Sequence, residues 1–136
     1  MGTRERRERS NESDRLLASL FTNVPGLALA AVGGYGRGEL SPGSDLDLLF
    51  LHNARIDEAT LSELVSKILY QLWDKSFKVD HSVRTRAQTR ESAAQDLRTA
   101  LGLLDIRYIC GEADLVASVR NDAIDDWRRH SHNRLP

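Results

Sequence analysis

A glycine-rich stretch followed by two alternating aspartates limits the possible folds of this sequence more than any other feature. Residues 33–47 read GGYGRGELSPGSDLD and contain five glycines. Glycine has no Cβ and tolerates positive φ, so its backbone N–H groups can approach a phosphate closely. The apolar run LALAAVGG leads into this stretch and is short enough for a buried strand. We therefore expect a glycine turn at the end of a strand.

Two well-known phosphate motifs do not fit this stretch. The pattern G-x-x-x-x-G-K-[ST] runs from Gly33 to Gly38 but meets Glu39 where lysine is needed. The dinucleotide fingerprint G-x-G-x-x-G places the same Glu39 at its third glycine, and we expect no helix after the loop. Both interpretations fail.

The aspartates Asp45 and Asp47 lie two residues apart at the start of the strand-like segment DLDLLFLH, so both carboxylates face the same side. Two such charges about 4 Å apart repel by roughly 4 kcal/mol, a cost that a cation or strong donors must offset. Oxygen ligands select Mg²⁺ or Mn²⁺. An EF-hand is excluded because Leu49 and Phe50 occupy ligand positions. An isolated D-x-D is more often a turn cap beside a solvated acid, but the glycine stretch favours a metal site.

Periodicity predicts the remaining elements. Apolar residues at helical spacing indicate helices over 16–21, 61–73 and 115–127 and from about 91 to 111. The segment 77–85 alternates and indicates a strand. The order of helices and strands predicts an α/β (α+β) fold with a small mixed sheet flanked by helices.

Several side chains can be assigned to a face on this basis. We expect Trp73 in the core, together with three leucines of the helix from residue 91, namely Leu97, Leu101 and Leu104. His81 falls on the same strand face as two valines, which favours a hydrogen-bonded core histidine. Asp105 and Arg107, placed in the later helix, are expected to form structural ion pairs.

Composition excludes several classes of protein. A net charge of −1 argues against a nucleic-acid binder, and the single Cys110 excludes an internal disulfide or a cysteine zinc cluster. The sequence contains no apolar run of about 18 residues, so we expect no membrane span and a cytoplasmic protein. The first fifteen residues are charged rather than apolar, which predicts a solvated or frayed helical lead-in and not a secretory signal.

The string GGYGRGELSPGSDLDLLFL, followed by LWD, HSVRT and LLDIRYICG, resembles the nucleotidyltransferase domain of bacterial PII uridylyltransferases, the bifunctional uridylyltransferase/uridylyl-removing enzymes. These belong to the DNA polymerase β-like nucleotidyltransferase superfamily. The resemblance covers about residues 30–111. It implies transfer of a nucleoside monophosphate from UTP, or from ATP as in similar actinobacterial members, to a tyrosine of the signalling protein PII, with release of pyrophosphate.

The resemblance also implies roles for the acidic residues. Asp45 and Asp47 are expected to be catalytic and to hold two Mg²⁺ (or Mn²⁺) ions. Asp80 is expected as the third catalytic carboxylate and metal ligand, because superfamily members place an acid on the strand after the helix that follows D-x-D. The alternative for Asp80 is a local substitution that pairs with Arg84.

The expected nucleotide-binding residues come mainly from the glycine stretch. Gly33 and Gly34 supply N–H donors to the β and γ phosphates, and Arg37 neutralises pyrophosphate unless it is only a solvated charge. Ser44 binds a phosphate oxygen or is only a turn residue. Arg84 contacts a phosphate or pairs with Asp80.

Three segments are expected: a helical lead-in over 1–25, a nucleotidyltransferase core over 26–111, and a C-terminal helix over 112–136 that begins a truncated helical region. The resemblance implies a much longer protein, because members of this family also contain an HD phosphohydrolase domain and ACT domains. We therefore expect this sequence to be a fragment. Two other functions remain open. One is a non-catalytic, antitoxin-like or regulatory module of this fold, and the other is a nucleotidyltransferase with a different acceptor.

Overall fold

The computed structural model describes residues 2–40 and 45–134. Along the chain the elements are α1 (Thr3–Leu20), β1 (Leu27–Ala31), α2 (Gly33–Gly36), β2 (Leu46–His52), α3 (Glu58–Asp74), β3 (Val79–Arg84), α4 (Arg86–Gln95), α5 (Leu97–Leu104), β4 (Arg107–Gly111) and α6 (Ala113–Arg134). No helix in this part of the chain combines the length and apolar character that a membrane crossing requires.

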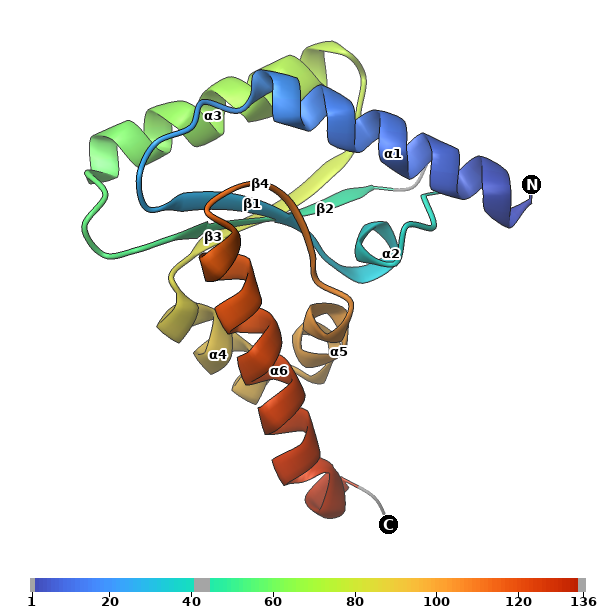
Figure 1. The fold of residues 1–136 in the computed structure, drawn as a ribbon, viewed down its shortest axis with the longest axis vertical. Coiled ribbons are helices and arrows are strands. Elements are labelled where there is room, and N and C mark those ends of the chain that lie inside the picture. The colour runs from blue at the N-terminus through green and yellow to red at the C-terminus, as the bar shows by residue number, and fades with distance from the viewer. Residues whose placement is uncertain (1, 41–44, 135–136) are drawn as a thin grey trace.

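The four strands form one mixed sheet in the order β3-β2-β1-β4. β1 pairs antiparallel with β2 and with β4, whereas β2 and β3 are parallel. A parallel pair needs a crossover connection, and α3 supplies it (Figure 1). The expected α/β (α+β) class with a small mixed sheet between helices is confirmed.

Helices cover both faces of the sheet, with α1 and α3 on one side and α4, α5 and α6 on the other (Figure 1). Successive side chains of β2 alternate between the two faces of the sheet. Leu48 and Phe50 join the core under α1 and α3, whereas Leu49 and Leu51 join the core under α5 and α6. β1 is buried along its whole length, as expected for a central strand covered on both faces.

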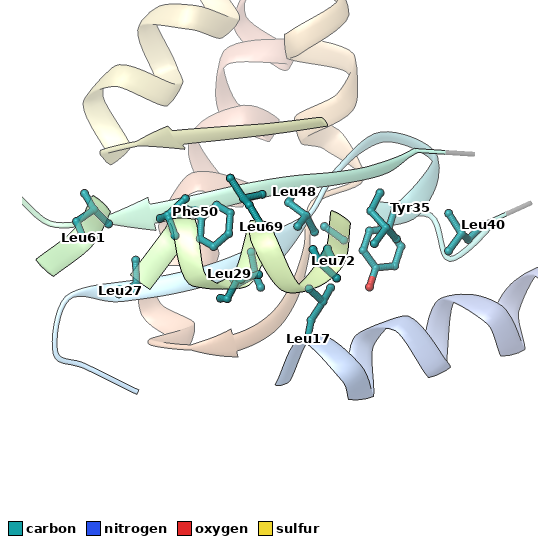
Figure 2. Packing of buried hydrophobic residues seen from close by; sticks show 14 residues of the cluster. Leu17, Leu27, Leu29, Tyr35, Leu40, Leu48, Phe50, Leu61, Leu69 and Leu72 are labelled. Atoms are coloured by element: carbon teal, nitrogen blue, oxygen red, sulfur yellow. The ribbon is translucent and has the colours of Figure 1, made fainter. Parts of the chain in front are cut away.

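The helix α3 forms as its periodicity predicts. It starts after Asp57, whose carboxylate accepts a hydrogen bond from the Thr60 N–H at 3.1 Å, an N-cap interaction. Its buried side chains recur every three or four residues and pack on β1 and β2 (Figure 2); they are Leu61, Val65, Ile68, Leu69 and Leu72.

The single helix predicted from about residue 91 to 111 is wrong. The backbone is extended at Asp96, with φ −139° and ψ 114°, and the Asp96 carboxylate caps α5 by accepting from the Arg98 N–H. The later part of the segment is β4, because residues 107–111 pair with β1 as the fourth strand. Arg107 therefore lies on a strand and not on a helix.

Three apolar side chains assigned to the core are half-exposed, because the helices that carry them face solvent at those positions. Leu97 and Leu101 are 53% and 45% exposed, and Leu103 is the buried leucine of α5. Trp73 is 50% exposed and makes an edge contact with Tyr70. The interpretation of these positions as core was wrong.

His81 is also exposed and not a core histidine. It lies on β3, an edge strand of the sheet, so no further strand shields it. Its ring meets the edge of Phe50 with 6.5 Å between centroids. Cys110, by contrast, packs against the core, and burial raises the pKa of its thiol to about 12.

The N-terminal segment is helical, as predicted, but it is not merely solvated. α1 buries Ser10, Ser13 and Leu17 against the rest of the protein. Leu17 contributes to the same core as α3 (Figure 2). The charge of the first residues masks this buried stripe, because only a few positions of the helix face inward.

Two bidentate ion pairs join α4 to α6. Arg86 donates to both carboxylate oxygens of Asp122 at 2.7 and 2.9 Å, and Arg90 donates to both of Asp126 at 2.8 and 2.6 Å. The hydrogen bonds from Arg86 lower the pKa of Asp122.

The depressed pKa of Asp122 predicts acid sensitivity. The pair stabilises fully above the unfolded-state pKa of about 3.9, and its contribution is lost as pH falls through the lower folded-state pKa. We expect Asp122→Asn to lower the urea midpoint at neutral pH, with a gap to wild type that narrows in acid. Urea titrations at several pH values check this, with the exposed Asp125→Asn as control. A gap that stays constant with pH would contradict it.

The burial pattern predicts unequal costs for two identical truncations. Leu72 is fully buried, so Leu72→Ala should lower the free energy of unfolding by about 2–5 kcal/mol. Leu101→Ala removes the same atoms from a half-exposed site and should cost no more than about 1 kcal/mol. Denaturant unfolding of both variants measures the difference, and equal losses would show that Leu101 is a core residue after all.

Candidate active site

A cavity of about 330 Å³ opens on the sheet face that α5 partly covers. Its walls come from the residues that follow β1, from β2, from β3 and from α5. The lining residues are Val32, Gly33, Asp47, Leu48, Leu49, Asp80, His81, Ser82, Arg84, Arg98, Thr99, Gly102 and Leu103. Four predicted site residues therefore meet in one cavity: Gly33, Asp47, Asp80 and Arg84.

The two carboxylates of the cavity lie on neighbouring strands in the same register. β2 and β3 are parallel, and Asp47 is the register partner of Asp80, so both side chains leave the sheet on the same face. Burial of its carboxylate raises the pKa of Asp47, and the negative charges of Asp80 and Asp45 raise it further. Asp45 immediately precedes β2 and is not among the residues that line the cavity.

The glycine turn, which consists of the short α2 (Gly33–Gly36), begins beside Asp47. The Val32 N–H donates to the Asp47 carbonyl at 3.1 Å, which closes the end of the β1–β2 pairing. Gly33 follows with φ +59°, and a Cβ at this position would come within 3.1 Å of Asp47 Oδ2. The positive φ favours glycine here, and an added Cβ would also crowd the Asp47 carboxylate.

The donor set at this position fits a hard divalent cation. In the described residues, none of Asp45, Asp47 and Asp80 forms an ion pair, so their repulsion is not offset by a protein cation. As it stands, this part of the chain contains no group of three acidic, histidine or cysteine side chains close enough to enclose a metal alone. Oxygen ligands of this kind suit Mg²⁺ or Mn²⁺, which usually complete their coordination with water and substrate phosphates.

Two arginines also line the cavity. Arg84 comes from β3 and Arg98 from α5, and among the described residues neither guanidinium forms an ion pair. The pair between Arg84 and Asp80 that we considered is therefore not formed. Cavity residues with free positive charge are suited to an anionic ligand.

Arg98 and Thr99 are site residues that the sequence interpretation missed. The signal was present at Asp96, whose carboxylate accepts from the Arg98 N–H and from the Thr99 hydroxyl, both at 3.0 Å. An aspartate followed by threonine three residues later is typical of a helix start. Treating the segment as one long helix concealed this start and the two side chains beside it.

Arg37 is not among the residues that line the cavity with Asp47 and Asp80. Its guanidinium donates to Asp105 at 3.1 Å and to Glu39 at 3.4 Å. Asp105 and Arg107 do form ion pairs, Asp105 with Arg37 and Arg107 with Asp14. Gly34 belongs to the turn α2, whereas Ser44 lies outside the described residues.

Comparison with known proteins agrees with this geometry. Residues 13–100 match the family model described as "Nucleotidyltransferase domain". A "Bifunctional uridylyltransferase/uridylyl-removing enzyme" of Streptomyces coelicolor is 48% identical over 139 aligned positions, which cover 99% of this chain and 16% of that protein. Proteins with the same name from Pseudoalteromonas translucida and Mycobacterium tuberculosis are 43% and 38% identical, each over 85% of this chain and 14% of the relative.

Solved structures support the same fold at lower identity. A crystal structure of a toxin-antitoxin with AMP-PNP aligns with a TM-score of 0.52 and 20% identity, covering 92% of this chain and 91% of that one. The curated relatives are much longer than this chain, which spans about one sixth of their length. The extent of the family match and the high identity to these relatives show that the chain belongs to the nucleotidyltransferase domain family.

Proposed function

We propose that this domain transfers a nucleoside monophosphate from UTP or ATP to a tyrosine of the PII signalling protein in the cytoplasm, releasing pyrophosphate. The observation that carries this proposal is the cavity in which Asp47 and Asp80 lie side by side beside the glycine turn. The relatives named as uridylyltransferases support the transfer of a nucleotidyl group. The donor base and the acceptor belong to the proposal alone.

In this mechanism the protein mainly positions groups and neutralises charge, as phosphoryl-group transfer requires. Asp45, Asp47 and Asp80 would hold Mg²⁺ or Mn²⁺, which when bound neutralises the triphosphate and acidifies the acceptor hydroxyl. The N–H groups of Gly33 and Gly34 donate to the β and γ phosphates. The tyrosine oxygen attacks the α phosphorus. The bond from the α phosphorus to the oxygen that bridges the α and β phosphates breaks, and pyrophosphate leaves.

The positive charges have separate places in this arrangement. Arg84 and Arg98 line the cavity and would neutralise oxygens of the triphosphate and of the departing pyrophosphate. Arg37 is paired with Asp105 and Glu39 and would reach a phosphate only by leaving these partners. We therefore assign the main electrostatic role to the two cavity arginines, and Ser44 retains its proposed phosphate contact.

Binding of magnesium and nucleotide should stabilise the fold together more than either alone. The metal removes the repulsion among Asp45, Asp47 and Asp80, and a ligand at a hundred times its Kd adds about 2.7 kcal/mol. Thermal unfolding with Mg²⁺, UTP, ATP and each Mg-nucleotide pair measures this. Absence of any shift at millimolar ligand, in folded protein, would show that the cavity does not bind triphosphate.

Substitution of the carboxylates should separate catalysis from stability. Asp47→Asn should reduce transfer at least about a hundredfold, the scale for loss of one preorganised electrostatic group. The fold should survive, because a repulsion is removed. Asp80→Asn should slow transfer while leaving triphosphate binding nearly intact. Single-turnover transfer to PII from labelled UTP and ATP measures both effects.

The matched control for these variants is Asp74→Asn, at the exposed end of α3 on the opposite face of the sheet. Its transfer rate should equal that of wild type. A rate for Asp80→Asn within about threefold of wild type would remove Asp80 from the site. Normal transfer by Asp47→Asn would reject the metal assignment, and nucleotide binding without transfer to PII would indicate another acceptor or an inert module.

A further inference from the structure

The back of the glycine turn is held by one arginine from the distant strand β4. Arg107 donates to the Tyr35 carbonyl at 2.8 Å and to the Gly36 carbonyl at 3.2 Å. It also pairs with Asp14 of α1, and its guanidinium lies over the Tyr35 ring, 5.1 Å from the centroid. One side chain therefore binds two consecutive carbonyls of the turn.

Asp14 completes this contact from the other side. Its carboxylate accepts the Tyr35 hydroxyl at 2.5 Å as well as the Arg107 guanidinium. Tyr35 is only 1% exposed, and Figure 2 shows its hydroxyl directed toward α1. Burial and the neighbouring Asp14 raise the pKa of Tyr35, so the phenol remains a donor at neutral pH.

The helix α1 also holds the far end of the loop. The buried Ser10 hydroxyl oxygen accepts from the Leu40 N–H at 3.1 Å. Behind the turn, a Cβ on Gly36 would come within 2.3 Å of the Asp105 carbonyl, so the turn lies directly on the chain that leads into β4. Residues 71 to 93 positions apart in sequence are in contact here.

Backbone hydrogen bonds connect the side of the turn that Arg107 contacts to the side that lines the cavity. The Gly36 N–H donates to the Val32 carbonyl and the Arg37 N–H to the Gly33 carbonyl, both at 3.0 Å. Gly33 is the residue that lines the cavity beside Asp47. A displacement of the carbonyls that Arg107 binds would therefore move the amide groups at the cavity.

We propose that Arg107 and Asp14 are positioning residues, which hold the glycine turn in the shape that binds the triphosphate of the nucleotide. This role rests on the proposed function, because it presupposes that the cavity binds a nucleoside triphosphate. Neither residue touches the substrate. Arg107 acts through the carbonyls of Tyr35 and Gly36, whereas Asp14 acts through Arg107 and the Tyr35 hydroxyl, so both affect phosphate binding more than a surface ion pair of the same type would.

The test is the substitution Arg107→Lys, which keeps the charge but loses the planar fork that reaches both carbonyls and Asp14. Its control is Arg90→Lys, the same change in the bidentate pair with Asp126, away from the turn. Calorimetry with Mg-UTP and Mg-ATP gives Kd, hydrogen exchange at the Arg37 and Gly38 amides reports the turn, and thermal unfolding gives Tm.

We expect Arg107→Lys to weaken triphosphate binding about tenfold, the size of one lost hydrogen bond to a charged group. Exchange at the Arg37 and Gly38 amides should accelerate in the free protein. Arg90→Lys should lower Tm comparably while leaving Kd and these two amides unchanged. Should Arg107→Lys fail to fold, Tyr35→Phe, which removes only the hydroxyl bound to Asp14, should change Kd and exchange in the same direction.

The outcomes separate the two proposals. If wild type binds Mg-UTP or Mg-ATP and a folded Arg107→Lys binds it equally, with unchanged exchange at the turn, the positioning role is overturned and the proposed function stands. If Tyr35→Phe is the variant used, unchanged Kd and exchange overturn the role in the same way. If wild type binds neither nucleotide, the proposed function fails and the positioning role fails with it.

Discussion

The antiparallel pairing of β1 with β2 is the constraint on which the site depends. Ala31 pairs with Leu48, and the next N–H, from Val32, closes the ladder on the Asp47 carbonyl. The chain must then turn away from β1 directly beside the Asp47 side chain. The positive φ of Gly33 favours glycine at this point, and an added Cβ would crowd the Asp47 carboxylate. The sheet register thus brings the glycine turn and the carboxylate together.

The same register produces an electrostatic cost. Parallel pairing of β2 with β3 sets Asp80 beside Asp47, and the pKa of Asp47 rises because its carboxylate is desolvated and near two other negative charges. A structure selected for stability alone would not collect unpaired acids on one face. A carboxylate with a raised pKa in a cavity is typical of functional sites, and binding of a cation would convert this repulsion into affinity.

Support for the site comes from elements outside it. α5 contributes a second wall with Arg98, whereas α1 and β4 hold the turn from behind through Asp14 and Arg107. Protein interiors are close-packed, so an element that packs behind a turn limits how far the turn can move. Two carbonyls of the short α2, those of Tyr35 and Gly36, are bound by the Arg107 side chain from β4.

The sequence by itself determined the local elements and the family. LALAAVGG, DLDLLFLH and the apolar spacing of residues 61–73 predicted β1, β2 and α3, because a short apolar run, an alternating run and a helical spacing are typical of these elements. The glycine stretch and the alternating aspartates indicated the nucleotidyltransferase family, which the comparisons confirm. The roles of Asp45, Asp47, Asp80 and the nucleotide-binding residues remain predictions.

Only the tertiary structure decided the conformation and exposure of residues whose contacts lie far away in sequence. Residues 107–111 become a strand because β1 offers a free edge, which no local pattern can reveal. Trp73 and Leu101 are half-exposed because periodicity marks an apolar position but not whether another element covers it. Arg98 reaches the cavity, and Arg107 the turn, through contacts across the fold. Whether these side chains are exposed to solvent or contact the site depends on long-range packing, because their local sequence is compatible with either.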